Sequence, residues 1–280
     1  MPPDDLRHAT TWRASLALAF ERRGERSVLA SRTHDGPLVV QKALHPEGEG
    51  VCHAIVVHPP AGIAGGDELS LQVDVQAGAH ALLTTPGAGK WYRTRGPRAL
   101  QRVAIVAHGD ACVEWLPQEN IFFEGADARV EWEASLEQGA RLIAWDIACL
   151  GRAASGEKFA AGRVHFEARI VRDGRLAWLD RGRIEPGGRV RAAQAGLAGA
   201  SVFGTLVAAA AEIPDACLAE CRAEKPARGE GAVTRLPGFL VARYRGDSSE
   251  SARHYFTALW KRLRAPVLGR EPVEPRIWST

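Results

Sequence analysis

A glycine-rich segment that ends in a lysine is the first candidate for chemistry in this sequence. It reads Leu83-Thr84-Thr85-Pro86-Gly87-Ala88-Gly89-Lys90-Trp91-Tyr92-Arg93. A phosphate-binding P-loop needs a glycine five residues before its Gly-Lys pair and a serine or threonine after the lysine. Thr84 and Trp91 occupy those positions here. The segment instead predicts a tight turn between strands, with Gly87 and Gly89 in backbone conformations that other residues avoid.

The loop from His58 to Asp67 is the second candidate, because it is too rich in proline and glycine for regular structure. Its ends carry an imidazole and a carboxylate, groups that can bind a metal or move a proton. An enzymatic interpretation brings His58, Asp67 and Lys90 together at a phosphate and predicts nucleotide binding or hydrolysis. The alternative is an ordinary turn whose aspartate accepts hydrogen bonds from its own backbone.

Two of the five cysteines, Cys217 and Cys221, are four residues apart in a predicted short helix that begins at Pro214-Asp215. At this spacing two thiols share one helix face and could bind a soft metal. No histidine lies near them in sequence, so buried or idle thiols are the alternative. The cysteines form no paired framework, and Met1-Pro2-Pro3-Asp4-Asp5 lacks the basic and apolar parts of a signal peptide. We therefore expect a cytoplasmic protein with reduced thiols.

The composition argues against nucleic-acid-binding and membrane proteins. The chain has 280 residues, 46% hydrophobic residues and a formal net charge of +3. That charge is too small to indicate a nucleic-acid partner, and acidic residues are scattered among the basic ones. No apolar run approaches the length of a membrane span, which is about eighteen residues or more. We expect neither a nucleic-acid nor a membrane partner.

The elements that position these residues are predicted to be β-strands. Alternating apolar residues recur along the chain, for example at Leu69, Leu71, Val73 and Val75. The turn glycines are about thirty residues apart, at Gly78, Gly109, Gly139 and Gly174. Such a period is typical of small units that bury their apolar faces only by stacking. We predict a mainly β, layered, β-helix-like stack of antiparallel hairpins with a few helices; an ordinary antiparallel sandwich would give a similar pattern.

Polar residues end several of the predicted return strands. If the units stack in register, these residues could line up along one inner face and form a hydrophilic passage. The alternative is that they point to solvent, and a slip of one residue reverses every face. The residues in question are Thr84, Glu114, Asp146 and Asp180.

A helix is predicted over residues 247–265, with Asp247 and Glu250 as a capping box and Pro266 as its stop. Its apolar stripe consists of Ala252, Tyr255, Phe256, Leu259, Trp260 and Leu263. Such a stripe usually packs on a core, and contact with a partner is the alternative. The tail 266–280 ends on Trp278, which suggests that the tail docks. Residues 1–11 are expected to be flexible.

Several blocks of the sequence carry a family resemblance. They are His58-Pro59-Pro60 with Gly65-Gly66-Asp67, residues 83–93, Glu114-Trp115-Leu116-Pro117-Gln118-Glu119, Cys149-Leu150-Gly151-Arg152 with Ser155-Gly156-Glu157, Thr234-Arg235-Leu236-Pro237-Gly238, Ala242-Arg243-Tyr244 and Pro275-Arg276-Ile277-Trp278. Together, and in this order, they resemble the UreD (UreH) family of urease accessory proteins, over residues 12–280 as one domain. Ala61 stands where we expect glycine and Asn120 where threonine is usual.

The resemblance implies a scaffold and not an enzyme. Members of this family bind apo-urease together with the helical partner UreF and the nickel-carrying GTPase UreG, and they help to deliver nickel to urease. The family fold is mostly β, in layered, helix-like coils, and an internal tunnel has been proposed as the nickel route. No tightly bound cofactor is expected, and Ni²⁺ would be bound only transiently.

From this resemblance we hypothesise a nickel path and a partner surface. The path would be lined or gated by Asp67, Thr84, Glu114, Asp146 and Asp180, as spaced, weak ligands. Contacts with UreF would come from the C-terminal helix and tail, at Tyr255, Trp260, Arg276 and Trp278. A passive scaffold without a metal path is the alternative within the same family.

Overall fold

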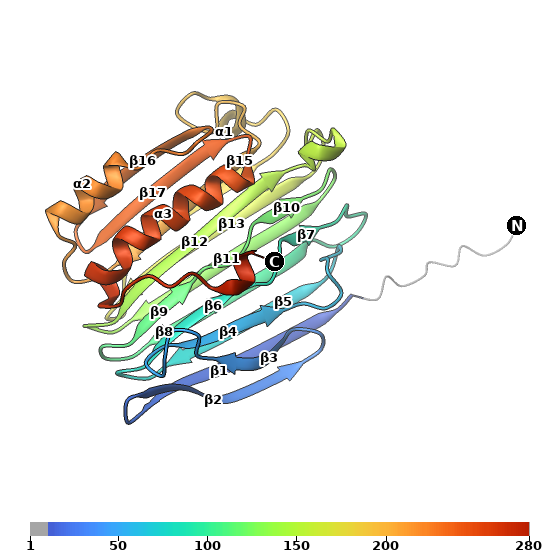
Figure 1. The fold of residues 1–280 in the computed structure, drawn as a ribbon. Coiled ribbons are helices and arrows are strands. Elements are labelled where there is room, and N and C mark those ends of the chain that lie inside the picture. The colour runs from blue at the N-terminus through green and yellow to red at the C-terminus, as the bar shows by residue number, and fades with distance from the viewer. Residues whose placement is uncertain (1–10, 280) are drawn as a thin grey trace, which may run out of the picture.

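Two β-sheets lie face to face in the computed structural model, which describes residues 11–279 (Figure 1). Sheet A has seven strands, in the spatial order β14 (Arg175–Ile184), β13 (Arg163–Arg172), β11 (Asp127–Leu136), β8 (Ala99–Ala107), β5 (Glu68–Val75), β1 (Arg13–Arg23) and β2 (Arg26–Asp35). Sheet B has ten strands. Its main path runs β16 (Glu230–Leu236), β17 (Phe239–Gly246), β15 (Val202–Ala209), β12 (Arg141–Leu150), β9 (Cys112–Trp115), β6 (His80–Thr84), β4 (Cys52–Val57) and β3 (Val39–Leu44), and the short strands β10 (Asn120–Phe122) and β7 (Gly89–Trp91) pair beside it.

The chain coils between the two sheets. It passes from β5 in sheet A to β6 in sheet B, then from β8 to β9 and from β11 to β12. Successive coils pair in parallel, so that Leu71 lies beside Val103 and Val103 beside Trp132. The predicted mainly β, layered, β-helix-like class with a C-terminal helix is confirmed.

The pairing inside the stack differs from the predicted antiparallel hairpins. The two strands of a central coil lie in opposite sheets and do not pair with each other. This arrangement places the apolar residues of both strands in one core, whereas a hairpin would leave both strands in the same sheet. Antiparallel hairpins do occur at the ends of sheet A, as β1–β2 and as β13–β14 around Gly174.

The central strands of sheet B are buried on both faces, and this explains why their sequence alternates less clearly. The inner face of sheet B packs on sheet A. Its outer face is covered by α2 (Asp215–Ala223) and by α3 (Ser249–Leu268), which crosses β12 and β15 in Figure 1. All five residues of β6 are buried in consequence. The short segments η1 (Ala153–Ser155), α1 (Arg189–Ala192) and η2 (Arg276–Ser279) lie outside the two sheets.

The predicted bounds of the C-terminal helix are wrong at both ends. Ser248, and not Asp247, is the N-cap, and its Oγ accepts a hydrogen bond from the Ser251 N–H at 3.1 Å. Pro266 lies inside the helix, which continues to Leu268 and ends at the left-handed Gly269. A proline cannot donate to the carbonyl four residues earlier. That carbonyl, on Arg262, accepts instead from the Cys217 thiol at 3.5 Å.

Two other expectations concern the ends of the chain and the region before α3. Strand β16 was not predicted from the sequence. The expected flexibility of residues 1–11 falls on residues that, apart from Thr11, lie outside the described part of the chain.

Candidate functional site

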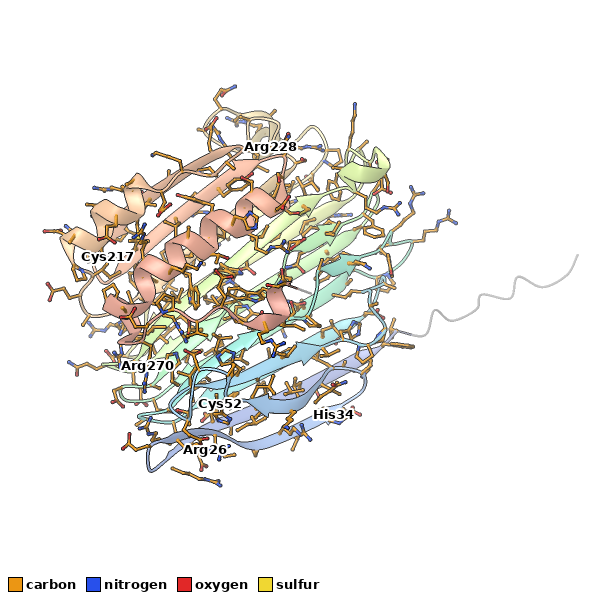
Figure 2. The ribbon with its side chains drawn as sticks, in the orientation of Figure 1. Arg26, His34, Cys52, Cys217, Arg228 and Arg270 are labelled. Carbon is orange, nitrogen blue, oxygen red and sulfur yellow. The ribbon has the colours of Figure 1, made fainter. Side chains whose placement is uncertain are left out.

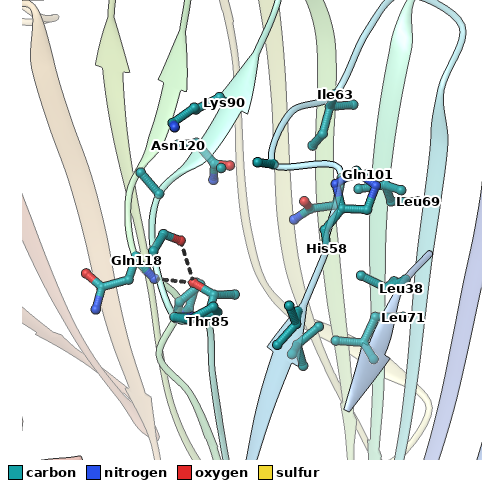
Figure 3. A pocket seen from close by; sticks show the side chains of 18 of the residues that line it. Leu38, His58, Ile63, Leu69, Leu71, Thr85, Lys90, Gln101, Gln118 and Asn120 are labelled. Atoms are coloured by element: carbon teal, nitrogen blue, oxygen red, sulfur yellow. Dashed lines mark hydrogen bonds between the residues drawn. The ribbon is translucent and has the colours of Figure 1, made fainter. Parts of the chain in front are cut away.

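The space between the sheets contains two cavities. Cavity 1 has a volume of about 360 Å³ and lies between β5 and β8 of sheet A and β4 and β9 of sheet B. Its mouth is formed by the loop after His58 and by the glycine-rich segment that ends at Lys90 (Figure 3). Most of its wall is apolar, and its polar lining residues are His58, Thr85, Lys90, Gln101, Gln118 and Asn120. Burial lowers the pKa of His58, which favours the neutral imidazole, although nearby Asp67 opposes the shift.

The glycine-rich segment is a strand edge and not a phosphate loop. It runs into β7, which pairs in parallel with β10, so it lacks the helix N-terminus that holds a phosphate in a P-loop. The predicted unusual backbone conformation of Gly87 and Gly89 is wrong, since neither has a positive φ. Gly89 is required for space. A Cβ there would lie 2.7 Å from Asn120 Oδ1, which accepts a hydrogen bond from Trp91 Nε1 at 2.9 Å.

Asp67 closes a turn, as in the alternative interpretation of its loop. Its carboxylate accepts hydrogen bonds from the backbone N–H of Trp12 at 3.0 Å and of Ala64 at 2.8 Å. His58 and Lys90 line cavity 1, but Asp67 is not among the lining residues. The three groups therefore do not converge on one point as the enzymatic interpretation requires.

Cavity 2 brings together two of the predicted path residues, Asp146 and Asp180. It has a volume of about 540 Å³ and lies next to cavity 1 in the stack, between β11, β13 and β14 and the strands β12, β15 and β17. Asp146 accepts a hydrogen bond from Trp132 Nε1. Asp180 Oδ2 accepts from Arg243 Nη1 at 2.6 Å and from Thr205 Oγ1 at 3.3 Å. Burial raises the pKa of Asp146 to about 7, and the charge of Asp180 adds to this rise.

The expectation that all the polar strand ends share one inner face is wrong for Thr84 and Glu114. Side chains alternate along a strand, and Val113 and Trp115 face the inner core, so Glu114 faces α3. Its carboxylate accepts hydrogen bonds from His80 Nε2 at 2.7 Å and Trp260 Nε1 at 2.6 Å. Thr84 donates to the carbonyl of Leu116 at 2.6 Å and accepts from Trp278 Nε1 at 2.9 Å, again on the helix-covered side.

A buried ionic network under α3 was not predicted. We call it the Arg264 cluster, and it consists of Glu47, His53, His80, Glu114, Trp260 and Arg264. Arg264 binds both carboxylate oxygens of Glu47, at 2.6 and 2.7 Å, and Glu114 Oε1 at 3.0 Å. Although burial opposes it, hydrogen bonds from His53 and Arg264 lower the pKa of Glu47 to about 2. Glu47 is 217 residues from Arg264 in the chain, so no local pattern announces the pair.

The predicted partner residues fall into two groups. Tyr255 and Trp260 are 3% and 0% exposed, because they pack between α3 and sheet B, so neither side chain is presented on the surface of this chain. Arg276 is exposed. Trp278 is half-buried against the rings of Trp145 and Trp260, with centroid separations of 5.4 and 5.6 Å. The tail thus docks on its own chain.

The cysteines are all buried and free. Figure 2 places Cys52 and Cys217 in different parts of the molecule, and burial raises the pKa of Cys221 to about 12. A thiol held in its neutral form is a poor metal ligand. Between residues 11 and 279, no three His, Cys, Asp or Glu side chains are grouped so that they could hold a metal ion. Within the same range, no helix is long and apolar enough to cross a membrane.

Comparison with known proteins gives matches over almost the whole chain. The family described as "UreD urease accessory protein" matches residues 13–279. A protein named "Urease accessory protein UreD" from Azoarcus sp. (strain BH72) is 53% identical over 272 residues, covering 96% of this chain and 94% of its own. Proteins of the same name from Dechloromonas aromatica (strain RCB) and Pseudomonas aeruginosa (strain PAO1) are 50% and 48% identical. The first alignment covers 100% of this chain and 99% of the relative, and the second covers 99% and 98%.

Proposed function

Because the chain belongs to the UreD family of urease accessory proteins, we propose that it acts as a cytoplasmic scaffold in the assembly that delivers Ni²⁺ to apo-urease. Its partners in this proposal are apo-urease, UreF and the GTPase UreG. The chain itself catalyses no reaction and holds nickel only in transit. The observation that carries the proposal is the match to the family over residues 13–279.

A route for the ion is the finer part of the proposal. Asp146 and Asp180 face the same cavity between the sheets, and Ni²⁺ is bound well by carboxylate and water oxygens. Two carboxylates without further protein ligands favour weak binding, which suits an ion that must leave again. With a pKa of about 7, Asp146 exchanges a proton near neutral pH, so that proton uptake there would promote release of the metal.

The two cavities are neighbours in the stack, which supports a route through both of them. Val103 on β8 lines cavity 1, and its partner on β11, Trp132, lines cavity 2. In this proposal Asp67 fixes the loop at the mouth of cavity 1, and Thr84 and Glu114 hold the tail and α3 on the far side of sheet B.

The first experiment measures nickel per urease active site after expression of the whole urease operon, with and without the gene for this chain. We expect nickel-poor, inactive urease without it. Equal nickel content and activity in both preparations would refute the accessory role.

The second experiment separates the nickel route from a passive scaffold. Asp146→Asn and Asp180→Asn keep side-chain size and one acceptor oxygen while removing the charges. We expect lower nickel loading with intact assembly of the complex. Glu133→Gln is the matched control, since Glu133 is a half-exposed carboxylate on the outer face of sheet A, where it pairs with Arg169. Normal nickel loading with both aspartate variants would refute the nickel route and support the passive scaffold.

A further inference from the structure

The loops that lead from sheet B back to sheet A in successive coils carry an excess of positive charge. We call this surface the basic rim and define it by Lys90, Tyr92, Arg93, Arg95, Phe123, Arg152 and Lys158. Within residues 11–279, the charged groups of Lys90, Arg93, Arg95 and Lys158 lie in no ion pair. Arg93 binds only the carbonyl of Glu124, at 3.4 Å. All four side chains are exposed.

The carboxylates of the same loops are already engaged. Asp67 binds two backbone N–H groups, and Glu124 accepts from the backbone N–H of Ala160 at 3.4 Å. Asp127 pairs with Arg98 at 2.7 Å and with Arg163 at 3.1 Å. Glu157 pairs with Arg152 at 2.5 Å. Backbone hydrogen bonds leave the negative charges of Asp67 and Glu124 in place, but the cations of these loops outnumber the carboxylates, so the field at this surface is positive although the net charge of the whole chain is small.

The outer face of sheet A provides the contrast. There, basic and acidic side chains neutralise one another across neighbouring strands, as in the pairs Arg13–Glu68, Arg102–Glu131 and Arg169–Glu133. A surface that needs only solubility is well served by such mixed charges. In the basic rim, by contrast, four exposed cations lie close together without an ion-pair partner among the residues that the structure describes.

An aromatic pair lies among the cations. Tyr92 is 39% exposed, and its ring contacts Phe123 edge to face, with centroids 5.2 Å apart. The guanidinium carbon of Arg152 lies 4.4 Å above the Phe123 ring. Gly62 makes room for Tyr92, because any Cβ at that position would overlap the tyrosine ring. Exposed tyrosines and arginines of this kind are typical hot spots of protein interfaces.

The backbone holds this surface in place. The Tyr92 N–H donates to the carbonyl of Ile63 at 2.9 Å, and the Phe123 N–H donates to that of Trp91 at 2.9 Å. The Thr94 N–H donates to the carbonyl of Gly125 at 3.0 Å. A preorganised surface loses little conformational entropy when a partner binds.

We propose that the basic rim docks a carboxylate-rich segment of a partner protein, with Tyr92 and Phe123 as its apolar anchor. The charges select an acidic partner, and the aromatic pair favours a protein over a nucleic acid. Bases stack on free aromatic faces, but Arg152 covers a face of Phe123 and Tyr92 meets that ring through an edge contact. The inference rests on the proposed function only in taking the partner from among the proteins of the urease operon.

The test uses the full chain and fluorescein-labelled poly-L-glutamate as a probe, with fluorescence anisotropy as the readout. The variant combines Lys90→Glu, Arg93→Glu and Arg95→Glu. We expect its affinity for the probe to fall about tenfold or more in dilute salt, and the difference to shrink near 0.5 M NaCl, where the Debye length is about 4 Å. The control combines Lys42→Glu and Arg175→Glu, which are exposed positions outside the basic rim, and should bind like the wild type.

The same variants are then tested for binding to purified apo-urease, UreF and UreG, one protein at a time. We expect one of these complexes to weaken about tenfold or more with the rim variant, and Tyr92→Ala to weaken the same complex by a similar factor. Unchanged thermal melting of the variants shows that they fold. Binding of all three proteins at wild-type strength overturns the inference, as does equal loss of binding in the control.

Two further outcomes also overturn it. Tighter binding of a short DNA duplex than of poly-L-glutamate would make the rim a nucleic-acid surface. Probe binding that appears only after deletion of residues 1–10 would make the chain's own first residues the occupant. The proposed function is judged separately, by whether urease nickel loading requires the chain at all.

Discussion

Replacement of Arg264 by methionine tests the account of how α3 is held on sheet B. Arg264 is 0% exposed and binds two carboxylates, those of Glu47 and Glu114. Methionine has a similar length but no charge, so Arg264→Met would leave both carboxylates buried without their common partner. Removal of one member of a buried ionic network typically costs about 3–5 kcal/mol of unfolding free energy. We expect a loss of that size in urea denaturation at pH 7.

The pH dependence gives an independent reading of the same network. The pKa of Glu47 is lowered from 4.5 to about 2, which corresponds to about 3 kcal/mol of stability. Because the pKa is lower in the folded state, this contribution is complete above about pH 4.5 and is lost as the pH falls towards 2. The wild type should therefore lose stability over this interval, and Arg264→Met should lose much less.

Two controls show whether the charges are responsible. Glu47→Gln and Glu114→Gln added to Arg264→Met remove the uncompensated charges and should restore most of the lost stability. Hydrogen exchange should quicken first in α3 and in the tail that follows it, because the cluster joins them to sheet B. If the unfolding free energy of Arg264→Met lies within about 1 kcal/mol of the wild-type value, the Arg264 cluster does not hold α3 on sheet B.

Three further predictions concern other parts of the chain. Asp146→Asn should stabilise the protein by up to about 4 kcal/mol above pH 7 and by progressively less down to about pH 4, because the partly buried carboxyl has a pKa raised from 3.8 to about 7. Urea denaturation at several pH values measures this. Gly89→Ala should cost about 1–3 kcal/mol in thermal melting, since its Cβ would displace Asn120, whereas Gly87→Ala meets no atom within 4 Å and should be neutral or slightly stabilising. Trp278→Ala should cost about 1–2 kcal/mol and make the tail more sensitive to proteolysis, which mass spectrometry of the fragments would detect.

The sequence predicts the stack because its signals are local. Alternation in β5 and glycines about thirty residues apart identify strands and turns without knowledge of their partners. Whether a turn such as that at Gly78 returns within one sheet or crosses to the other depends on where both strands find apolar neighbours. That is a property of the assembled core. The prediction of antiparallel hairpins was therefore wrong for the central coils, whose strands pair in parallel with those of the next coil.

The predicted nickel-path residues lie on opposite faces of sheet B, which the sequence also could not reveal. Asp146 and Glu114 both lie on strands of sheet B, but their side chains point to opposite faces, one to cavity 2 and the other to α3. In a sheet with one wet face, the sequence itself would reveal which face a polar residue occupies. Sheet B is covered on both sides, and alternation then carries no such information.

Arg264 shows most clearly what the sequence could not predict. In the helical pattern it lies off the apolar stripe, among residues that we expect in solvent, yet it is fully buried. The helix lies across a broad sheet, so the arc that it buries is wider than the stripe. An arginine at the edge of that arc can be buried only where carboxylates meet it, and these come from Glu47 and Glu114, 217 and 150 residues away. The charge that favours exposure of Arg264 in an isolated helix is thus matched, in the fold, by two carboxylates under α3.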